Sequence, residues 1–126
     1  MAIRILDIGQ CGFDGPRMAV LWHEAIGAVV DRCASGADAL SCAAKDQYDI
    51  ILVNRVLDAD RSSGLEVIRS LIHAGISTPI MLVSDLPEAQ DAAVALGAVR
   101  GFGKASLGDP ETIDLVARVA GKDRSP

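Results

Sequence analysis

The chain has 126 residues, enough for one domain with a single hydrophobic core. Half of the residues are hydrophobic but only 3% are aromatic, which excludes both an intrinsically disordered chain and an aromatic platform for stacking nucleic-acid bases. Twelve basic against 17 acidic side chains give a formal charge of −5, so we do not expect direct binding to nucleic acid or to an anionic membrane.

Five short apolar runs recur along the chain, and each is typical of a β-strand. They cover residues 3–8, 28–31, 49–54, 79–84 and 99–102. The third and fourth runs, DIILVN and PIMLVS, are continuously apolar rather than alternating, which favours strands that are covered on both faces. We therefore expect an interior parallel sheet.

A segment with helical character follows each of these runs. The five segments cover residues 16–27, 35–44, 63–75, 85–97 and 109–121. Their ends carry capping signals, such as the capping-box spacing of Ser63 and Glu66 and the glycine stop at Gly97. We expect one domain over residues 1–121 and a frayed tail over residues 122–126.

Strands that alternate with helices indicate an α/β fold with a (βα)₅ chain. Right-handed crossovers and two covered faces favour a doubly wound three-layer sandwich. In such sheets ligands bind at the carboxyl ends of the strands, near the point where the strand order reverses. The residues that follow the first, third, fourth and fifth strands are therefore the candidates for a functional site.

Four segments of the sequence resemble the receiver domains of two-component response regulators, namely DIILVN, GLEVIRSL, TPIMLVS and GAVRGFGK. The resemblance spans almost the whole chain and implies a flavodoxin-like sheet of strand order 2-1-3-4-5. Such receivers carry two acids after the first strand, a phospho-accepting Asp ending the third, a Ser or Thr ending the fourth and a Lys ending the fifth. The carboxylates bind Mg²⁺, and the Asp attacks a phosphoryl group.

Only half of this pattern is present in the chain. Ser84 and Lys104 match the hydroxyl and the lysine, but Asn54 stands at the phospho-acceptor position. Gly9 and Gln10 stand where the acidic pair is expected. Because an amide cannot act as the aspartyl nucleophile, the resemblance implies a pseudo-receiver that is not an enzyme, binds no catalytic metal and needs no cofactor; Mg²⁺ binding is not expected.

Each of these residues also has a purely structural interpretation. Asn54 is either an amide that bonds to the local backbone or a fixed mimic of one signalling state. Ser84 can be a strand-end hydroxyl with a backbone partner. Lys104 can retain an anion-binding role, remain solvated, or pair with Asp85 or Asp7.

An alternative is a phosphorylatable receiver with relocated carboxylates, which Asp7, Asp58 and Asp60 would supply. Asp58 and Asp60 lie in the segment RVLDADRSS, which is longer than the corresponding family loop, and ordinary ion pairs with its arginines are the simpler interpretation. Asp7 lies inside an apolar strand, so its charge needs a partner such as Arg4 or Lys104, or a proton.

The resemblance also implies where partners bind. Receivers generally dimerise and bind their outputs through the face formed by the fourth helix, the fifth strand and the fifth helix. The contacts expected on this face are Leu86, Ala89, Val94, Phe102, Leu107 and Ile113. The leading hypothesis is a phosphorylation-independent interaction module in two-component signal transduction that binds a protein partner or forms a homodimer.

A third hypothesis is a small-molecule or anion-binding flavodoxin-like domain that uses Lys104 and the loop over residues 11–16.

Cys11, Cys33 and Cys42 are odd in number and lack C-x-x-C spacing, so free thiols in a reducing compartment are expected. The sequence shows no signal peptide and no apolar stretch of bilayer length. We therefore expect a cytoplasmic domain.

Overall fold

The structure is a computed structural model that describes residues 2–121. Strands and helices alternate along this part of the chain, as the sequence predicts. The elements are β1 (Arg4–Ile8), α1 (Asp14–Ile26), β2 (Val29–Cys33), α2 (Gly36–Lys45), β3 (Ile50–Asn54), α3 (Gly64–His73), β4 (Ile80–Val83), α4 (Pro87–Leu96), β5 (Val99–Phe102), the 3₁₀ turn η1 (Lys104–Ser106) and α5 (Pro110–Gly121).

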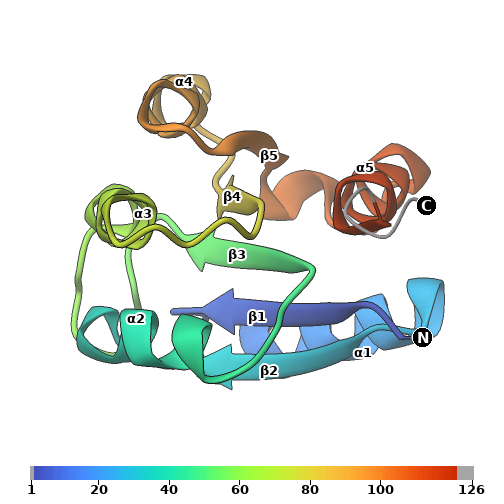
Figure 1. The fold of residues 1–126 in the computed structure, drawn as a ribbon. Coiled ribbons are helices and arrows are strands. Elements are labelled where there is room, and N and C mark those ends of the chain that lie inside the picture. Colours follow the sequence, from blue (N-terminus) through green and yellow to red (C-terminus); the bar gives the residue numbers. More distant parts are fainter. Residues whose placement is uncertain (1, 122–126) are drawn as a thin grey trace.

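The five strands form one parallel sheet of order β2-β1-β3-β4-β5 (Figure 1), which confirms the predicted fold class. In the register of this sheet, Asp7 of β1 lies beside Arg32 of β2 and Leu52 of β3. The pairing of β4 with β5 is irregular near Gly101, where a side chain would overlap the carbonyl oxygen of Leu82. Because all the pairings are parallel, the carboxyl ends of the strands lie along one edge of the sheet, where β1 and β3 are neighbours.

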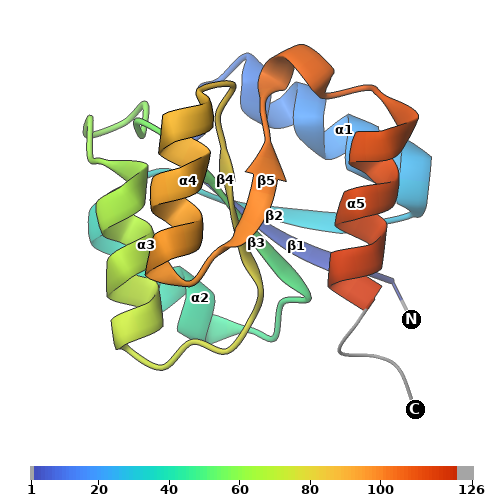
Figure 2. The ribbon, with the colours of Figure 1, turned by 90° about the horizontal axis from the view of Figure 1, so that it is seen from above.

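Helices cover both faces of the sheet. Helices α1 and α5 lie on one face, and α2, α3 and α4 lie on the other (Figure 2). Every residue of β4 is buried, as are the first four of β3, which explains why both strands are continuously apolar. Among residues 2–121, no helix combines the length and the apolar character that a membrane span requires.

Local capping chemistry places most of the helix ends where the sequence predicts them. The Ser35 hydroxyl accepts from the backbone N–H of Asp38, and the Ser63 hydroxyl accepts from that of Glu66. Helix α1 differs, because it begins at Asp14, two residues before the predicted start at Pro16. This earlier start brings a carboxylate to the first turn of α1, directly beside the carboxyl ends of the strands.

Candidate functional site

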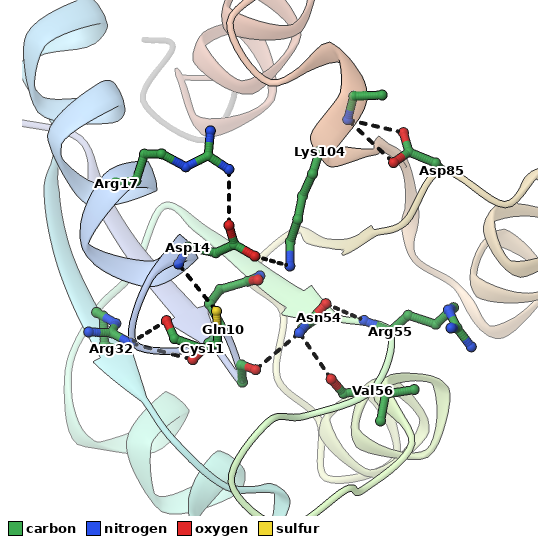
Figure 3. A network of polar contacts seen from close by, with 12 residues as sticks. Gln10, Cys11, Asp14, Arg17, Arg32, Asn54, Arg55, Val56, Asp85 and Lys104 are labelled. Atoms are coloured by element: carbon green, nitrogen blue, oxygen red, sulfur yellow. Dashed lines mark hydrogen bonds and ion pairs between the residues drawn. The ribbon is translucent and has the colours of Figure 1, made fainter.

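The edge where β1, β3 and β4 end holds the residues that the sequence analysis singles out. Asn54 and Ser84 line a shallow cleft of about 370 Å³ there, and Lys104 borders it from η1. Figure 3 shows the polar network around this cleft, in which Lys104 turns toward α1 and Asn54 turns toward the loop that follows β1. The predicted gathering of strand-end residues is therefore present, and Asn54, Ser84 and Lys104 each have a side-chain hydrogen bond within the described chain.

The Asn54 side chain is fully used in bonding to the backbone. Its amide nitrogen donates to the carbonyl oxygens of Gly9 and Val56, at 3.1 and 3.0 Å. Its amide oxygen accepts from the backbone N–H of Arg55 at 3.0 Å. The side chain thus ties the end of β3 to the loop after β1, and the donor–acceptor pattern requires an amide, because a carboxylate could not donate to the two carbonyls.

Gly9 stands at the first position of the expected acidic pair and has a backbone that disfavours any side chain. Its φ is 86°, in the left-handed region, and a Cβ placed there would overlap the side chain of Leu57. Leu57 is fully buried although it lies in the polar loop between β3 and α3. The backbone N–H of Asp58 also donates to the Gly9 carbonyl at 3.0 Å, so this loop lies directly against the end of β1.

Lys104 forms an ion pair that the sequence analysis missed. Its Nζ lies 2.8 Å from Oδ2 of Asp14, whose Oδ1 lies 3.0 Å from the guanidinium of Arg17. Hydrogen bonds from Lys104 and Arg17 hold the pKa of Asp14 below its ordinary value. The predicted partners of Lys104 are wrong, because the Asp85 carboxylate accepts from the backbone N–H of Ala105 and Asp7 forms no ion pair with any residue from 2 to 121.

Ser84 also has a local partner. Its hydroxyl oxygen accepts from the backbone N–H of Leu86 at 3.1 Å, which forms a short turn into α4. Its own backbone N–H donates to the carbonyl of Phe102. The strand-end hydroxyl is therefore engaged in the way that the structural interpretation of the sequence expects.

Asp7 and Gln10 are buried side by side beneath the ion pair of Asp14 and Lys104. They are 1% and 6% exposed, and within the described chain neither side chain has a hydrogen-bond partner. Burial raises the pKa of Asp7 to about 7, although the nearby Gln10 amide and the charges of Arg32 and Lys104 act in the opposite direction. Asp7 therefore keeps a proton at pH values where an exposed aspartate has lost it.

Arg4, the other predicted partner of Asp7, pairs with different carboxylates, so this prediction is wrong. The Arg4 guanidinium binds Asp31 at 3.0 Å and Asp46 at 2.7 Å. Because β1 is pleated, successive side chains alternate between the two faces of the sheet. The guanidinium of Arg4 instead lies between Asp31 in β2 and Asp46 at the C-cap of α2.

The two loop acids are not brought to Asp7. Asp60 accepts from the backbone N–H groups of Gly36 and Ser62, at 3.0 and 3.1 Å, which places it at the first turn of α2. Asp58 is exposed. In the described part of the chain, no three His, Cys, Asp or Glu side chains lie where they could share a metal ion. Relocated carboxylates are therefore not assembled in this structure.

The expected interaction face is only partly exposed. Ala89, Phe102 and Leu107 are buried, with exposures of 8%, 6% and 5%, so their inclusion in a binding surface is wrong. Phe102 packs edge-on against Trp22 in the layer that α1 and α5 form with the sheet. Of the remaining expected contacts, Leu86 and Val94 are exposed and Ile113 is half-buried; these are the three that a partner could reach.

No family model matches the sequence, and no curated protein matches it. The fold nevertheless matches solved structures closely. NtrX from Brucella abortus superimposes with a TM-score of 0.83 at 18% identity, over 98% of this chain and 28% of that one. This chain thus spans little more than a quarter of the length of NtrX.

Two further structures match over most of both chains. The chemotaxis protein CheY4 of Vibrio cholerae superimposes with a TM-score of 0.75 at 22% identity, over 94% of this chain and 99% of that one. A response regulator from Burkholderia pseudomallei, solved with a phosphorylated aspartic acid and a calcium ion, gives 0.73 at 19% identity, over 97% and 71%. At the level of the fold, the chain is thus similar to response-regulator receiver domains.

Proposed function

We propose that this chain is a signalling module with a receiver fold that works through protein contacts and does not depend on phosphorylation of an aspartate at the end of β3. The observation that carries the proposal is the contact between Leu57 and Gly9. It places an apolar side chain where the first acid of a receiver would project, and the left-handed backbone of Gly9 disfavours any replacement that carries a Cβ.

The residues at this edge do not suit the Mg²⁺ ion that receiver chemistry requires. Mg²⁺ binds oxygen ligands in octahedral geometry and usually takes one or two carboxylates from the protein. Here Asn54 points its two N–H donors at the carbonyls of Gly9 and Val56, and the Asp14 carboxylate is neutralised by Lys104 and Arg17. Burial raises the pKa of Asp7 to about 7, so this carboxyl group is largely protonated below that pH.

Internal contacts also replace the role that a phosphoryl group has in a receiver. A phosphoryl group on the strand-three aspartate would bond to the strand-four hydroxyl and the strand-five lysine. In this chain the hydroxyl of Ser84 is bonded to the backbone of Leu86, and Lys104 is paired with Asp14. These contacts support a module in which Ser84 and Lys104 keep the same partners and do not switch between two states.

The exposed side of α4, from its N-cap Leu86 to Val94 in its last turn, is the surface that we propose for partner binding. Leu86 and Val94 are 42% and 43% exposed, and Leu86 borders an open groove of about 480 Å³ between α4 and the loop before α3. The groove also contains Arg55 and Arg61, for which the described residues provide no ion-pair partner. The lining also includes one acid, Glu88, so the two guanidinium groups leave the groove with one net positive charge. A largely apolar groove of this charge suits a partner segment that combines apolar and acidic side chains.

Site-specific photo-crosslinking in the source cells tests this surface. A photoreactive residue at position 86 should yield a discrete crosslinked protein or a crosslinked second copy of the chain. The matched control carries the same residue at position 118, an exposed site on α5, and should yield none. Equal crosslinking from both positions, or crosslinking from position 118 alone, would contradict the proposed surface.

The independence from phosphorylation has its own test. Amide spectra of the ¹⁵N-labelled chain should superimpose before and after addition of Mg²⁺ and acetyl phosphate. Shifts of Asn54, Ser84 and Lys104 that appear only when both reagents are present would contradict this part of the proposal. The two experiments are separate, so failure of one leaves the other informative.

A further inference from the structure

Two cysteines lie next to each other beside β2, the edge strand of the sheet. Cys33 is the last residue of β2, and Cys42 lies in α2. Both belong to the apolar layer that α2 forms with the sheet, where Cys33 is 4% exposed and Cys42 is half-buried. The crossover from β2 to α2 thus returns the chain so that the second cysteine packs against the first.

The environment of the two thiols differs. The Cys33 thiol donates to the backbone carbonyl of Ser35 at 3.6 Å. Burial, together with the adjacent Cys42 thiol, raises the pKa of Cys33 to about 12. Because the thiolate is the reactive form of cysteine, Cys33 on its own is a poor nucleophile at neutral pH. The more exposed Cys42 is the thiol that a reagent meets first.

An open cleft gives small molecules access to this pair. It has a volume of about 500 Å³, and both cysteines line it together with Asp38, Ser41 and Lys45. Cys11, the third cysteine, lies in the loop between β1 and α1, where its sulfur accepts from the backbone N–H of Asp14. Cys11 therefore provides an internal control, because it is not part of the pair.

We propose that Cys33 and Cys42 form a redox-active dithiol, a modification site that small disulfides such as oxidised glutathione convert into an intramolecular disulfide. In the first step the Cys42 thiolate attacks one sulfur of the reagent, which forms a mixed disulfide and releases one thiolate. In the second step Cys33 loses its proton to solvent and attacks the Cys42 sulfur, which releases the second thiolate. The two protein thiols supply two electrons, and one small disulfide is reduced to two thiols.

The product would covalently join the end of β2 to α2. The Cys33 side chain lies in the layer that α2 forms with the sheet. The redox step uses none of the side chains on which the proposed function rests, so the inference does not depend on that function. It would make the position of α2 on the edge of the sheet sensitive to the thiol–disulfide balance of the surroundings.

The test uses the full chain with Cys11→Ser, which leaves only the pair. After incubation with oxidised glutathione, intact mass should show the loss of two hydrogens without a retained glutathione. Peptide mapping without reduction should recover a peptide that joins Cys33 to Cys42, and dithiothreitol should reverse the change. In the Cys11→Ser/Cys33→Ala variant, a stable glutathione adduct should accumulate on Cys42.

The complementary variant, Cys11→Ser/Cys42→Ala, should react at least about tenfold more slowly, because only the buried thiol of Cys33 remains. If Cys33→Ala fails to fold, acid quenching of the Cys11→Ser reaction should still trap the Cys42 adduct before the disulfide forms. A final state with glutathione retained on Cys42 and Cys33 still reduced would overturn the proposal. So would a folded pair that stays reduced under conditions that oxidise the same chain in urea.

Discussion

Leu57 occupies the space in which a side chain on Gly9 would lie. The two residues are far apart in sequence, and they meet because the loop between β3 and α3 folds back over the end of β1. An isolated antiparallel bridge between Val56 and Ser63 closes the base of this loop. The contact makes the end of β1 part of the apolar core, at the position where the resemblance to receivers implies the first acid.

Substitution of Gly9 tests this contact. We expect Gly9→Ala to lower the free energy of unfolding by about 2 kcal/mol or more, because the left-handed backbone and the overlap with Leu57 both oppose a Cβ. Urea denaturation measures the change. Gly12→Ala is the matched control, since a Cβ there meets no atom within 4 Å, and should change stability by less than about 0.5 kcal/mol. Equal effects of the two substitutions would contradict the account.

Asn54→Asp should introduce the residue that the resemblance to receivers implies at this position, without creating a metal site. The new carboxylate would face the carbonyls of Gly9 and Val56, which now accept from the amide. We expect a loss of about 1–3 kcal/mol in stability and no Mg²⁺ binding by calorimetry. Asn54→Ala separates the lost hydrogen bonds from the added repulsion and should be the milder change. Magnesium binding by Asn54→Asp alone would show that the missing acidic pair has been misassigned.

The ion pair between Asp14 and Lys104 predicts a dependence on acid pH. Because the folded-state pKa of Asp14 lies below its ordinary value of 3.8, the pair contributes stability above that value and loses it as the pH falls through the lower folded-state pKa. Asp14→Asn should therefore cost about 1 kcal/mol near neutral pH and progressively less in acid.

The control for this substitution is Asp114→Asn, which removes a well-exposed pair with Arg118 and should change stability by less than about 0.5 kcal/mol. Unfolding in urea at several pH values supplies the measurement. If Asp14→Asn matched Asp114→Asn at neutral pH, the pair at the strand ends would have no special role in stability.

Asp7 predicts the opposite dependence. Its pKa is raised from 3.8 to about 7 by burial, so between these values the folded state holds a proton that the unfolded state has lost. This group should therefore lower stability as the pH rises through that window, by up to about 1.4 kcal/mol per pH unit. Asp7→Asn should remove this slope and be more stable than the native chain above the folded-state pKa.

Asp58→Asn provides the comparison for Asp7, because it makes the same chemical change at an exposed position. It should leave the pH dependence of unfolding as in the native chain. A native chain whose stability is flat between about pH 4 and about pH 7, with no change on Asp7→Asn, would show that the buried carboxylate is already compensated.

Periodicity and capping were sufficient to predict the architecture from the sequence. The apolar runs that become β3 and β4, and the caps at Ser35 and Ser63, are local signals that the structure retains. The position of Asn54 and Ser84 at one edge follows from the parallel sheet itself. These features depend on short-range chemistry, which is why the sequence alone predicts them.

The contacts that distinguish this site were not predictable in the same way. The partner of Lys104 depends on α1 starting at Asp14 rather than Pro16, a shift of two residues that capping preferences do not resolve. Leu57 lies in a loop with four charged residues, and only the tertiary fold shows that it is buried against Gly9. The unusual length of this loop is the signal in the sequence that points to a special structure here.

The central proposal is that the edge of the sheet at Asn54 does not accept a phosphoryl group. Intact mass of the native chain after incubation with Mg²⁺ and acetyl phosphate tests this claim most directly, with a phosphorylatable receiver such as CheY4 of Vibrio cholerae as the positive control. We predict that the mass of the native chain is unchanged while the control reacts. A gain of one phosphoryl group that maps to Asp7, Asp58 or Asp60 would contradict the account.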